Sequence, residues 1–177
     1  MCGFIGFSGN LDNKEAILQK MMDRIVHRGP DMGGMYTDDG IALGFRRLSI
    51  LDAGAQPMAN EDKSVVVVFN GEIYNFMELR RELEAKGHTF HCGADTEVLI
   101  HGYEEYGTEL IYRLRGMFAF VLWDAKNKRM FGARDIFGIK PFYYYPVPDG
   151  SGLVFGSEIK AFLEHPKFVK AVNENAL

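Results

Sequence analysis

The chain has 177 residues, of which 47% are hydrophobic and 25% charged, and its formal net charge is −4. This composition is ordinary for a globular protein, and the length favours one domain with a substantial core. The negative charge argues against nucleic acid as a partner, and no apolar stretch is long enough to cross a bilayer. With two cysteines and no secretory signal pattern, we expect a reducing, cytoplasmic location.

The first third of the sequence predicts a strand, a helix and a hairpin. Residues 2–8 have the character of a buried strand, with two glycines that leave room for a neighbour. Asp12 and Glu15 have the spacing of a capping box, which predicts that a helix begins here. Its apolar face is formed by Ile17, Leu18, Met21, Met22 and Ile25. Residues 36–51 predict a hairpin that turns at 38–40.

The remaining sequence predicts two capped helices and a series of strands. Residues 65–69 are a continuous β-type run. Helices are expected from Asn75 to just before Gly87, and from Asp95 onward. Further strands are expected at 118–123, 129–134, 142–145 and 153–155, and a short helix at 157–163.

Strands and helices both occur, but they do not alternate regularly along the chain. This order favours an α+β fold, in which antiparallel sheets carry helices on their faces, over a doubly wound parallel sheet. We expect residues 1–165 to form the domain and the charged segment 166–177 to begin a linker.

Cys2 is the residue with the most distinctive chemistry. If Met1 is removed, Cys2 carries a thiol and a free α-amine on the same carbon. An α-amine has a pKa of about 7.7 to 8.0, so it can act as the general base for the neighbouring thiol. The alternative interpretation is a small apolar residue that begins a strand.

The pair Asn70-Gly71 has two interpretations. After a strand, this pair is typical of a type I′ hairpin turn. Alternatively, the Asn70 amide and the Gly71 backbone N–H are two donors that could stabilise an oxyanion, which a thiol attacking an amide requires.

Two charged residues also have a structural and a functional interpretation. Arg47 is either an exposed strand residue or a guanidinium that grips a carboxylate. Asp95 is either a helix N-cap or a ligand for an ammonium group. The group His88, His91, Cys92 and Asp95 matches no strong zinc pattern, so we expect no metal site.

Seven segments together resemble one known family, the glutaminase domain of glutamine-hydrolysing asparagine synthetases. This is a class II glutamine amidotransferase domain with an N-terminal nucleophile. The resemblance covers nearly the whole chain and differs at Ala94, where the family usually has serine. The matching segments are Cys-Gly-Phe-Ile-Gly (2–6), His-Arg-Gly-Pro-Asp (27–31), Arg-Leu-Ser-Ile (47–50), Asn-Gly-Glu-Ile-Tyr-Asn (70–75), Asp-Thr-Glu-Val (95–98), Arg-Asp-Ile-Phe-Gly-Ile-Lys-Pro (134–141) and Phe-Gly-Ser-Glu-Ile-Lys-Ala (155–161).

The resemblance implies a four-layer αββα sandwich of the N-terminal nucleophile hydrolase type. It implies that Cys2 is the nucleophile and that Asn70 and Gly71 form the oxyanion hole. It also implies that Arg47 binds the glutamine α-carboxylate and Asp95 the α-ammonium, while Glu72 lies in the substrate loop. Segments 134–141 and 155–161 are expected to be scaffold or interface residues.

The resemblance also implies the partners. Glutamine is the expected substrate, and the ammonia passes to an ATP-dependent synthetase domain in cis, whose Ser-Gly-Gly-x-Asp-Ser loop does not occur here. ATP and Mg²⁺ are expected only in that domain, and no cofactor in this one. No nucleic acid or membrane partner is expected, and a homodimer is left open.

Three alternatives to this function were considered. The chain could be an amidase for another amide, a catalytically silent regulatory or docking module, or an amidotransferase domain that serves an acceptor other than aspartate.

Overall fold

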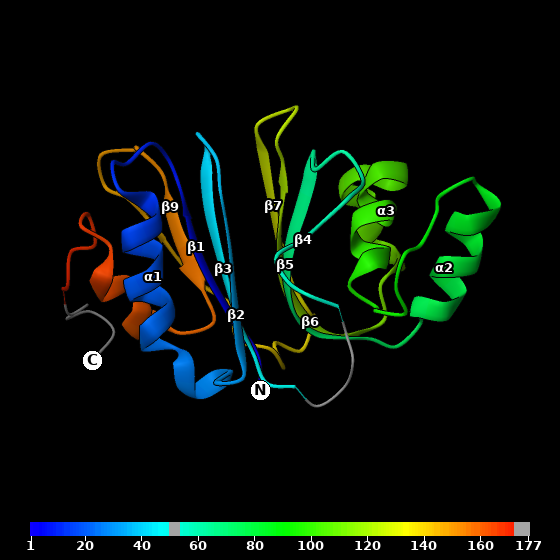
Figure 1. Ribbon diagram of the computed structural model, residues 1–177, viewed down its shortest axis with the longest axis horizontal. Helices are drawn as coiled ribbons and strands as arrows, with labels where there is room; N and C mark the ends of the chain where they lie inside the picture. Colours follow the sequence, from blue (N-terminus) through cyan, green and yellow to red (C-terminus); the bar gives the residue numbers. More distant parts are fainter. Residues whose placement is uncertain (50–53, 172–177) are drawn as a thin grey trace.

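The computed structural model describes residues 1–49 and 54–171 (Figure 1). Two antiparallel sheets lie face to face, and helices cover the outer face of each sheet, which gives the four-layer arrangement visible in Figure 1. The predicted α+β fold, an αββα sandwich, is confirmed. In the described residues, no helix combines the length and apolar character needed to span a membrane.

The first sheet carries the N-terminal strand near its centre. Its strands, in spatial order, are β2 (Met32–Thr37), β3 (Ile41–Arg47), β1 (Gly3–Ser8), β9 (Leu153–Gly156) and β8 (Tyr143–Pro146). Because β1 pairs with β3 on one side and β9 on the other, the backbone that follows Cys2 is held on both edges.

The second sheet is built on two long central strands. Its strands, in spatial order, are β4 (Met58–Ala59), β5 (Val65–Ile73), β6 (Gly116–Asp124) and β7 (Arg129–Arg134). Successive side chains of β5 alternate between the two faces. Val66 and Val68 pack between the sheets, whereas Val65, Val67 and Phe69 face the helices. Both faces are buried, which explains why this strand is a continuous apolar run.

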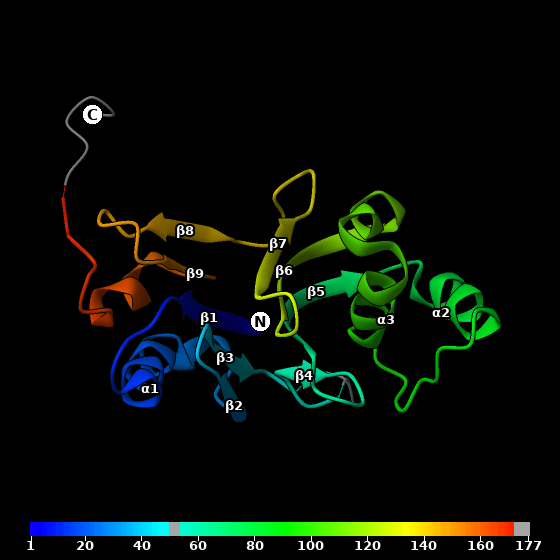
Figure 2. The ribbon, with the colours of Figure 1, turned by 90° about the horizontal axis from the view of Figure 1, so that it is seen from above.

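Helices close the outer faces of the two sheets. The α-helices are α1 (Lys14–Arg24), α2 (Phe76–Ala85) and α3 (Glu97–Tyr106), and the 3₁₀ helices are η1 (Val26–Arg28), η2 (Gly107–Arg113) and η3 (Ile159–Glu164). Leu18, Met21 and Met22 of α1 pack on Ile5 and Phe7 of the first sheet. Both views show that α3 lies nearest the second sheet and that α2 lies beyond it (Figures 1 and 2).

Four details differ from the sequence-based predictions. Asn70-Gly71 is not a hairpin turn, because β5 continues through both residues while paired with β6. The predicted capping box at Asp12 does not form, because α1 begins one residue later with Asn13 as its N-cap. The C-terminal helix is a 3₁₀ helix. The hairpin strand β3 ends at Arg47, and residues 50–51 of the prediction lie outside the described residues, as do 172–177 of the predicted linker.

Candidate active site

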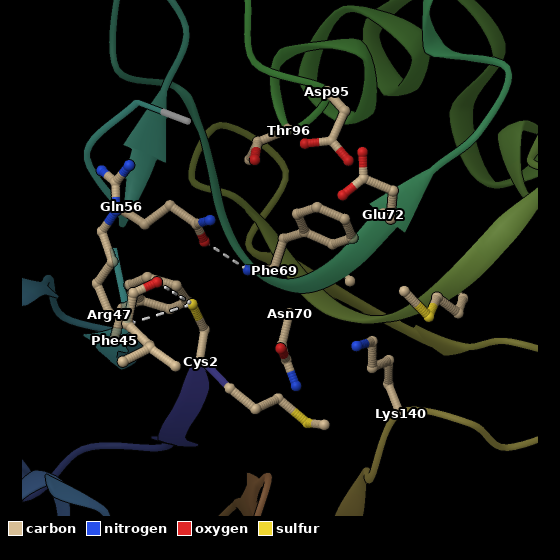
Figure 3. Close-up of a pocket in the computed structure, with 14 residues that line it drawn as sticks. Cys2, Phe45, Arg47, Gln56, Phe69, Asn70, Glu72, Asp95, Thr96 and Lys140 are labelled. Atoms are coloured by element: carbon tan, nitrogen blue, oxygen red, sulfur yellow. Dashed lines mark hydrogen bonds between the residues drawn. The ribbon is translucent and has the colours of Figure 1, made fainter. Parts of the chain in front are cut away.

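A pocket of about 340 Å³ opens where the ends of the two sheets meet (Figure 3). All six residues predicted as site residues from the sequence line it: Cys2, Arg47, Asn70, Gly71, Glu72 and Asp95. Cys2 directly precedes β1 and Arg47 ends β3 of the first sheet, whereas Asn70, Gly71 and Glu72 belong to β5 of the second. The fold therefore brings together residues that are far apart in the sequence, and the volume suits a small molecule.

The Cys2 thiol is held by backbone groups of the loop that follows β3. The Leu48 N–H donates to Sγ at 3.5 Å, and Sγ lies 3.7 Å from the Leu48 carbonyl oxygen. Met1 also lines the pocket, so the Cys2 nitrogen is a peptide amide in this chain. A basic α-amine exists at Cys2 only after Met1 is removed.

Arg28 fixes the backbone of Cys2. Its Nε donates to the Cys2 carbonyl at 3.0 Å, and its Nη1 donates to Glu158 at 3.1 Å. A charged side chain of the His-Arg-Gly-Pro-Asp segment therefore positions Cys2 through its backbone carbonyl. The sequence alone does not indicate this role of Arg28.

Asn70 presents an unsatisfied donor to the pocket. The residue is 3% exposed, and its Nδ2 is buried with no hydrogen-bond partner among the described residues. A buried donor without a partner costs about 1 to 3 kcal/mol. In Figure 3 its amide lies between Cys2 and Lys140. An oxygen bound in this pocket would satisfy the donor.

The Gly71 N–H points to the edge of β5 that faces away from β6. Backbone N–H groups of alternate residues in a strand point to the same edge. The N–H groups of Phe69 and Ile73, two residues before and after Gly71, both point away from β6. Phe69 donates to Gln56 Oε1 (2.7 Å), and Ile73 donates to Asp95 Oδ2 (2.8 Å). A Cβ on Gly71 would lie 2.3 Å from a backbone oxygen of β6, so the position requires glycine.

Two carboxylates make the other end of the pocket negative. Asp95 is 9% exposed, and burial raises its pKa to about 6, with a smaller contribution from the charge of Glu72. Figure 3 shows the two carboxylates close together. Asp95 is not a side-chain N-cap of α3, because α3 has Thr96 as its N-cap and Asp95 accepts a hydrogen bond from Ile73 instead. A cation bound here would favour the ionised form of Asp95.

Arg47 places a positive charge in the pocket wall. Its Nη1 donates to the Gly54 carbonyl at 2.8 Å, which orients the half-buried guanidinium at the end of β3. The pocket thus combines the Arg47 guanidinium at the end of β3 with the carboxylates of Glu72 in β5 and Asp95 just before α3, and opposite charges of this kind would recognise a zwitterion.

Three polar residues of the pocket wall were not predicted from the sequence: Gln56, Thr96 and Lys140. Lys140 lies in segment 134–141, which we expected to be scaffold or interface, but it is 8% exposed and lines the pocket. Its place in a matching segment was a usable signal. Nothing in the sequence marked Gln56, whose role becomes visible only through its bond to the backbone of β5.

A family model for the glutamine amidotransferase domain matches residues 1–177. The chain belongs to this family. This glutamine amidotransferase domain is 46% identical over 170 residues to asparagine synthetase [glutamine-hydrolyzing] 1 of Bacillus subtilis, covering 92% of the chain and 27% of that protein. It is also 46% identical over 166 residues to asparagine synthetase [glutamine-hydrolyzing] 2 of Arabidopsis thaliana, covering 91% of the chain and 28% of that protein. The chain thus spans less than a third of the length of these relatives.

A solved structure supports the fold independently. The glutamine amidotransferase domain superimposes on glutamine phosphoribosylpyrophosphate amidotransferase from B. subtilis with a TM-score of 0.76. The match covers 91% of this chain and 43% of that one. At 23% sequence identity, this likeness establishes the shared fold alone.

Proposed function

We propose that this chain hydrolyses the side-chain amide of glutamine through a thioester on Cys2, releasing glutamate and ammonia. One observation carries the proposal: Cys2 and the unsatisfied Asn70 amide line the same pocket, together with one guanidinium and two carboxylates. The proposed chemistry needs a nucleophile, an oxyanion donor and groups for both charged ends of an amino acid, and the pocket wall offers a candidate for each.

The first step requires that Met1 has been removed. The free α-amine of Cys2 then accepts the thiol proton, and Sγ attacks the amide carbon of glutamine. A C–S bond forms, and the carbonyl π electrons move to the oxygen. Asn70 Nδ2 and the Gly71 N–H donate to that oxyanion.

The second step returns the proton and breaks the C–N bond. The protonated α-amine gives its proton to the leaving nitrogen, ammonia departs, and a γ-glutamyl thioester remains on Cys2. Water then attacks the thioester, which releases glutamate and restores the thiol. The proposed hydrolysis uses no metal or organic cofactor.

Substrate selection follows from the charges of the pocket. Arg47 would bind the α-carboxylate, and Asp95 with Glu72 would bind the α-ammonium. An acid that lacks the amine would leave Asp95 buried without a partner charge and should therefore bind poorly.

The ammonia is proposed to serve an ATP-dependent synthetase domain in cis, with asparagine synthase as the parent activity. The names of the curated relatives support this assignment. An apolar loop next to Lys140 of the pocket supports it too, because Ile136 is 93% exposed, Phe137 84% and Ile139 54%. Such exposed apolar groups are typical of a surface that meets another domain. ATP and Mg²⁺ would bind in that domain.

The test measures glutamate release from glutamine and aspartate release from asparagine, for the wild type and for Cys2→Ala. We expect release from glutamine alone and none in the variant. A glutamine-mimicking electrophile should alkylate Cys2. Failure of both alkylation and hydrolysis would favour the silent docking module, and preferential hydrolysis of another amide would favour a different amidase.

A further inference from the structure

A second cluster of reactive side chains lies away from the pocket, between α2 and α3. His88 follows the end of α2, and His101 and Glu104 lie three residues apart on α3, so both face the same side of that helix. One ligating atom from each of the three side chains lies within 4.8 Å of the others. Among the described residues, this is the group that could hold a metal ion.

Both imidazoles direct Nδ1 toward the same carboxylate oxygen. His101 Nδ1 lies 2.8 Å from Glu104 Oε2, and His88 Nδ1 lies 3.6 Å from that atom. The ring centroids of the two histidines are 5.2 Å apart. Two nitrogens and one oxygen are therefore close enough together to be brought onto one ion.

The atoms of each ligand that would not bind the ion also have neighbouring polar groups. His88 Nε2 lies 3.4 Å from Glu105 Oε2, and His101 Nε2 lies 3.8 Å from Glu97 Oε1. The remaining oxygen of Glu104, Oε1, accepts a hydrogen bond from Asn60 at 2.7 Å. In metal sites the ligating histidines usually face a carboxylate, and the ligating carboxylates are usually hydrogen-bonded themselves.

His101 is pre-positioned by burial and packing. It is 2% exposed, and the ring of Phe90 packs edge-on against it with the centroids 4.8 Å apart. Its orientation is therefore fixed before any ion arrives. Access is from the side of His88 and Glu104, whose side chains are 18% and 25% exposed.

We propose that His88 Nδ1, His101 Nδ1 and Glu104 Oε2 bind one divalent transition-metal ion of the Zn²⁺ class. Two imidazoles and one carboxylate suit Zn²⁺, Co²⁺ or Ni²⁺ better than Mg²⁺ or Ca²⁺, and water completes a tetrahedral shell. On binding, the metal replaces the proton between His101 Nδ1 and Glu104. That proton moves to His101 Nε2 if the ring is neutral, or to water if Nε2 is already protonated, and Nε2–H then faces Glu97. This ligand set shares only His88 with the group of His88, His91, Cys92 and Asp95, for which the sequence predicts no metal site.

The site is connected to the wall of the pocket. Glu97 also accepts the backbone N–H groups of His91 (2.7 Å) and Cys92 (3.0 Å), in the segment that leads to Asp95. The ion would therefore stabilise this segment and the packing of α2 on α3. It would take no part in amide hydrolysis, so the inference does not depend on the proposed function.

The test is Zn²⁺ titration calorimetry and Co²⁺ absorption spectroscopy on the chelator-treated chain, with the melting temperature as a second readout. We expect one Co²⁺ ion per chain with a visible tetrahedral spectrum, and a higher melting temperature with Zn²⁺. His88→Ala should weaken binding by at least about tenfold, since even supporting residues of metal sites are worth 10- to 100-fold. His91→Ala is the matched control, because His91 is 66% exposed and lies outside the cluster.

Three results would overturn the proposal. They are absence of saturable binding by the wild type, unchanged affinity in His88→Ala, or a thiolate-to-cobalt charge-transfer band showing that a cysteine binds the ion. If His88→Ala proves unfolded, Glu104→Gln replaces it, because the variant keeps the shape of the side chain and removes the anionic ligand; full affinity in that variant would equally refute the site.

Discussion

Replacing Asp95 by asparagine should stabilise the unliganded protein at neutral pH while removing the proposed glutaminase activity. Asp95 is buried, and its pKa is raised from the ordinary value of 3.8 to about 6. The folded chain therefore pays a penalty for ionising this group. Asparagine has almost the same shape and can still accept the hydrogen bond from the Ile73 N–H, but it carries no charge.

The size and pH range of this effect follow from the raised pKa. Each pKa unit corresponds to about 1.4 kcal/mol, so the span from 3.8 to about 6 corresponds to at most about 3 kcal/mol. The folded state holds the Asp95 proton more tightly, so the penalty is absent below pH 3.8, grows as the pH rises, and is complete above about pH 6. At 2 to 4 °C per kcal/mol, the upper limit is a gain of about 6 to 12 °C in melting temperature.

The assay compares melting temperatures of Asp95→Asn and wild type without glutamine at pH 4 and pH 8. We expect a large difference at pH 8, little at pH 4, and loss of glutaminase activity in the variant. Asp149→Asn is the control, because hydrogen bonds from Ser151 and Lys167 hold the pKa of that exposed carboxylate low. The reasoning is refuted if Asp95→Asn is no more stable at pH 8, or if the control gains as much.

The other predictions concern the proposed chemistry. Cys2→Ala should abolish glutamate release in a coupled assay. If the variant turned over at the wild-type rate, the thioester would be excluded. Intact mass should show active protein without Met1; activity in a chain that retains Met1 would exclude the α-amine base. Asn70→Ala should lower kcat by about 10²- to 10³-fold with a folded spectrum, and a normal kcat would remove its oxyanion role. Arg47→Ala should raise KM by about 10- to 100-fold, because hydrogen bonds to charged groups contribute about 1.5 to 3 kcal/mol. An unchanged KM would contradict carboxylate binding by Arg47.

The sequence predicted best where a pattern depends on burial. The strands predicted at 65–69 and 118–123 are apolar because the sheets and helices bury them, and they match β5 and β6 to within four residues at each end. The strand predicted at 129–134 matches β7 at both ends, although no residue of β7 is fully buried. The hydrophobic face of α1 was predicted for the same reason, since Leu18, Met21 and Met22 are buried as expected.

The sequence predicted poorly where tertiary contacts override a local preference. Asn70-Gly71 favours a turn locally, but the pairing of β5 with β6 continues through both residues and keeps them in the strand. The two-residue strand β4 has no detectable pattern of its own, because it depends on pairing with β5. The six site residues were found as a set through the resemblance, and their individual roles stay predictions.

Because β1 lies at the centre of its sheet, the first sheet can be completed only late in the synthesis of the chain. The Leu153 N–H donates to the Ser8 side chain across a separation of 145 residues, and β9 is the last strand to reach β1. At roughly 5 to 20 residues per second, a ribosome needs about 7 to 30 s to make that stretch. During this time the first sheet lacks one of the two neighbours of β1. We therefore expect the removal of Met1 that the proposed function requires to take place while the chain is still being synthesised, before β9 completes the sheet around β1.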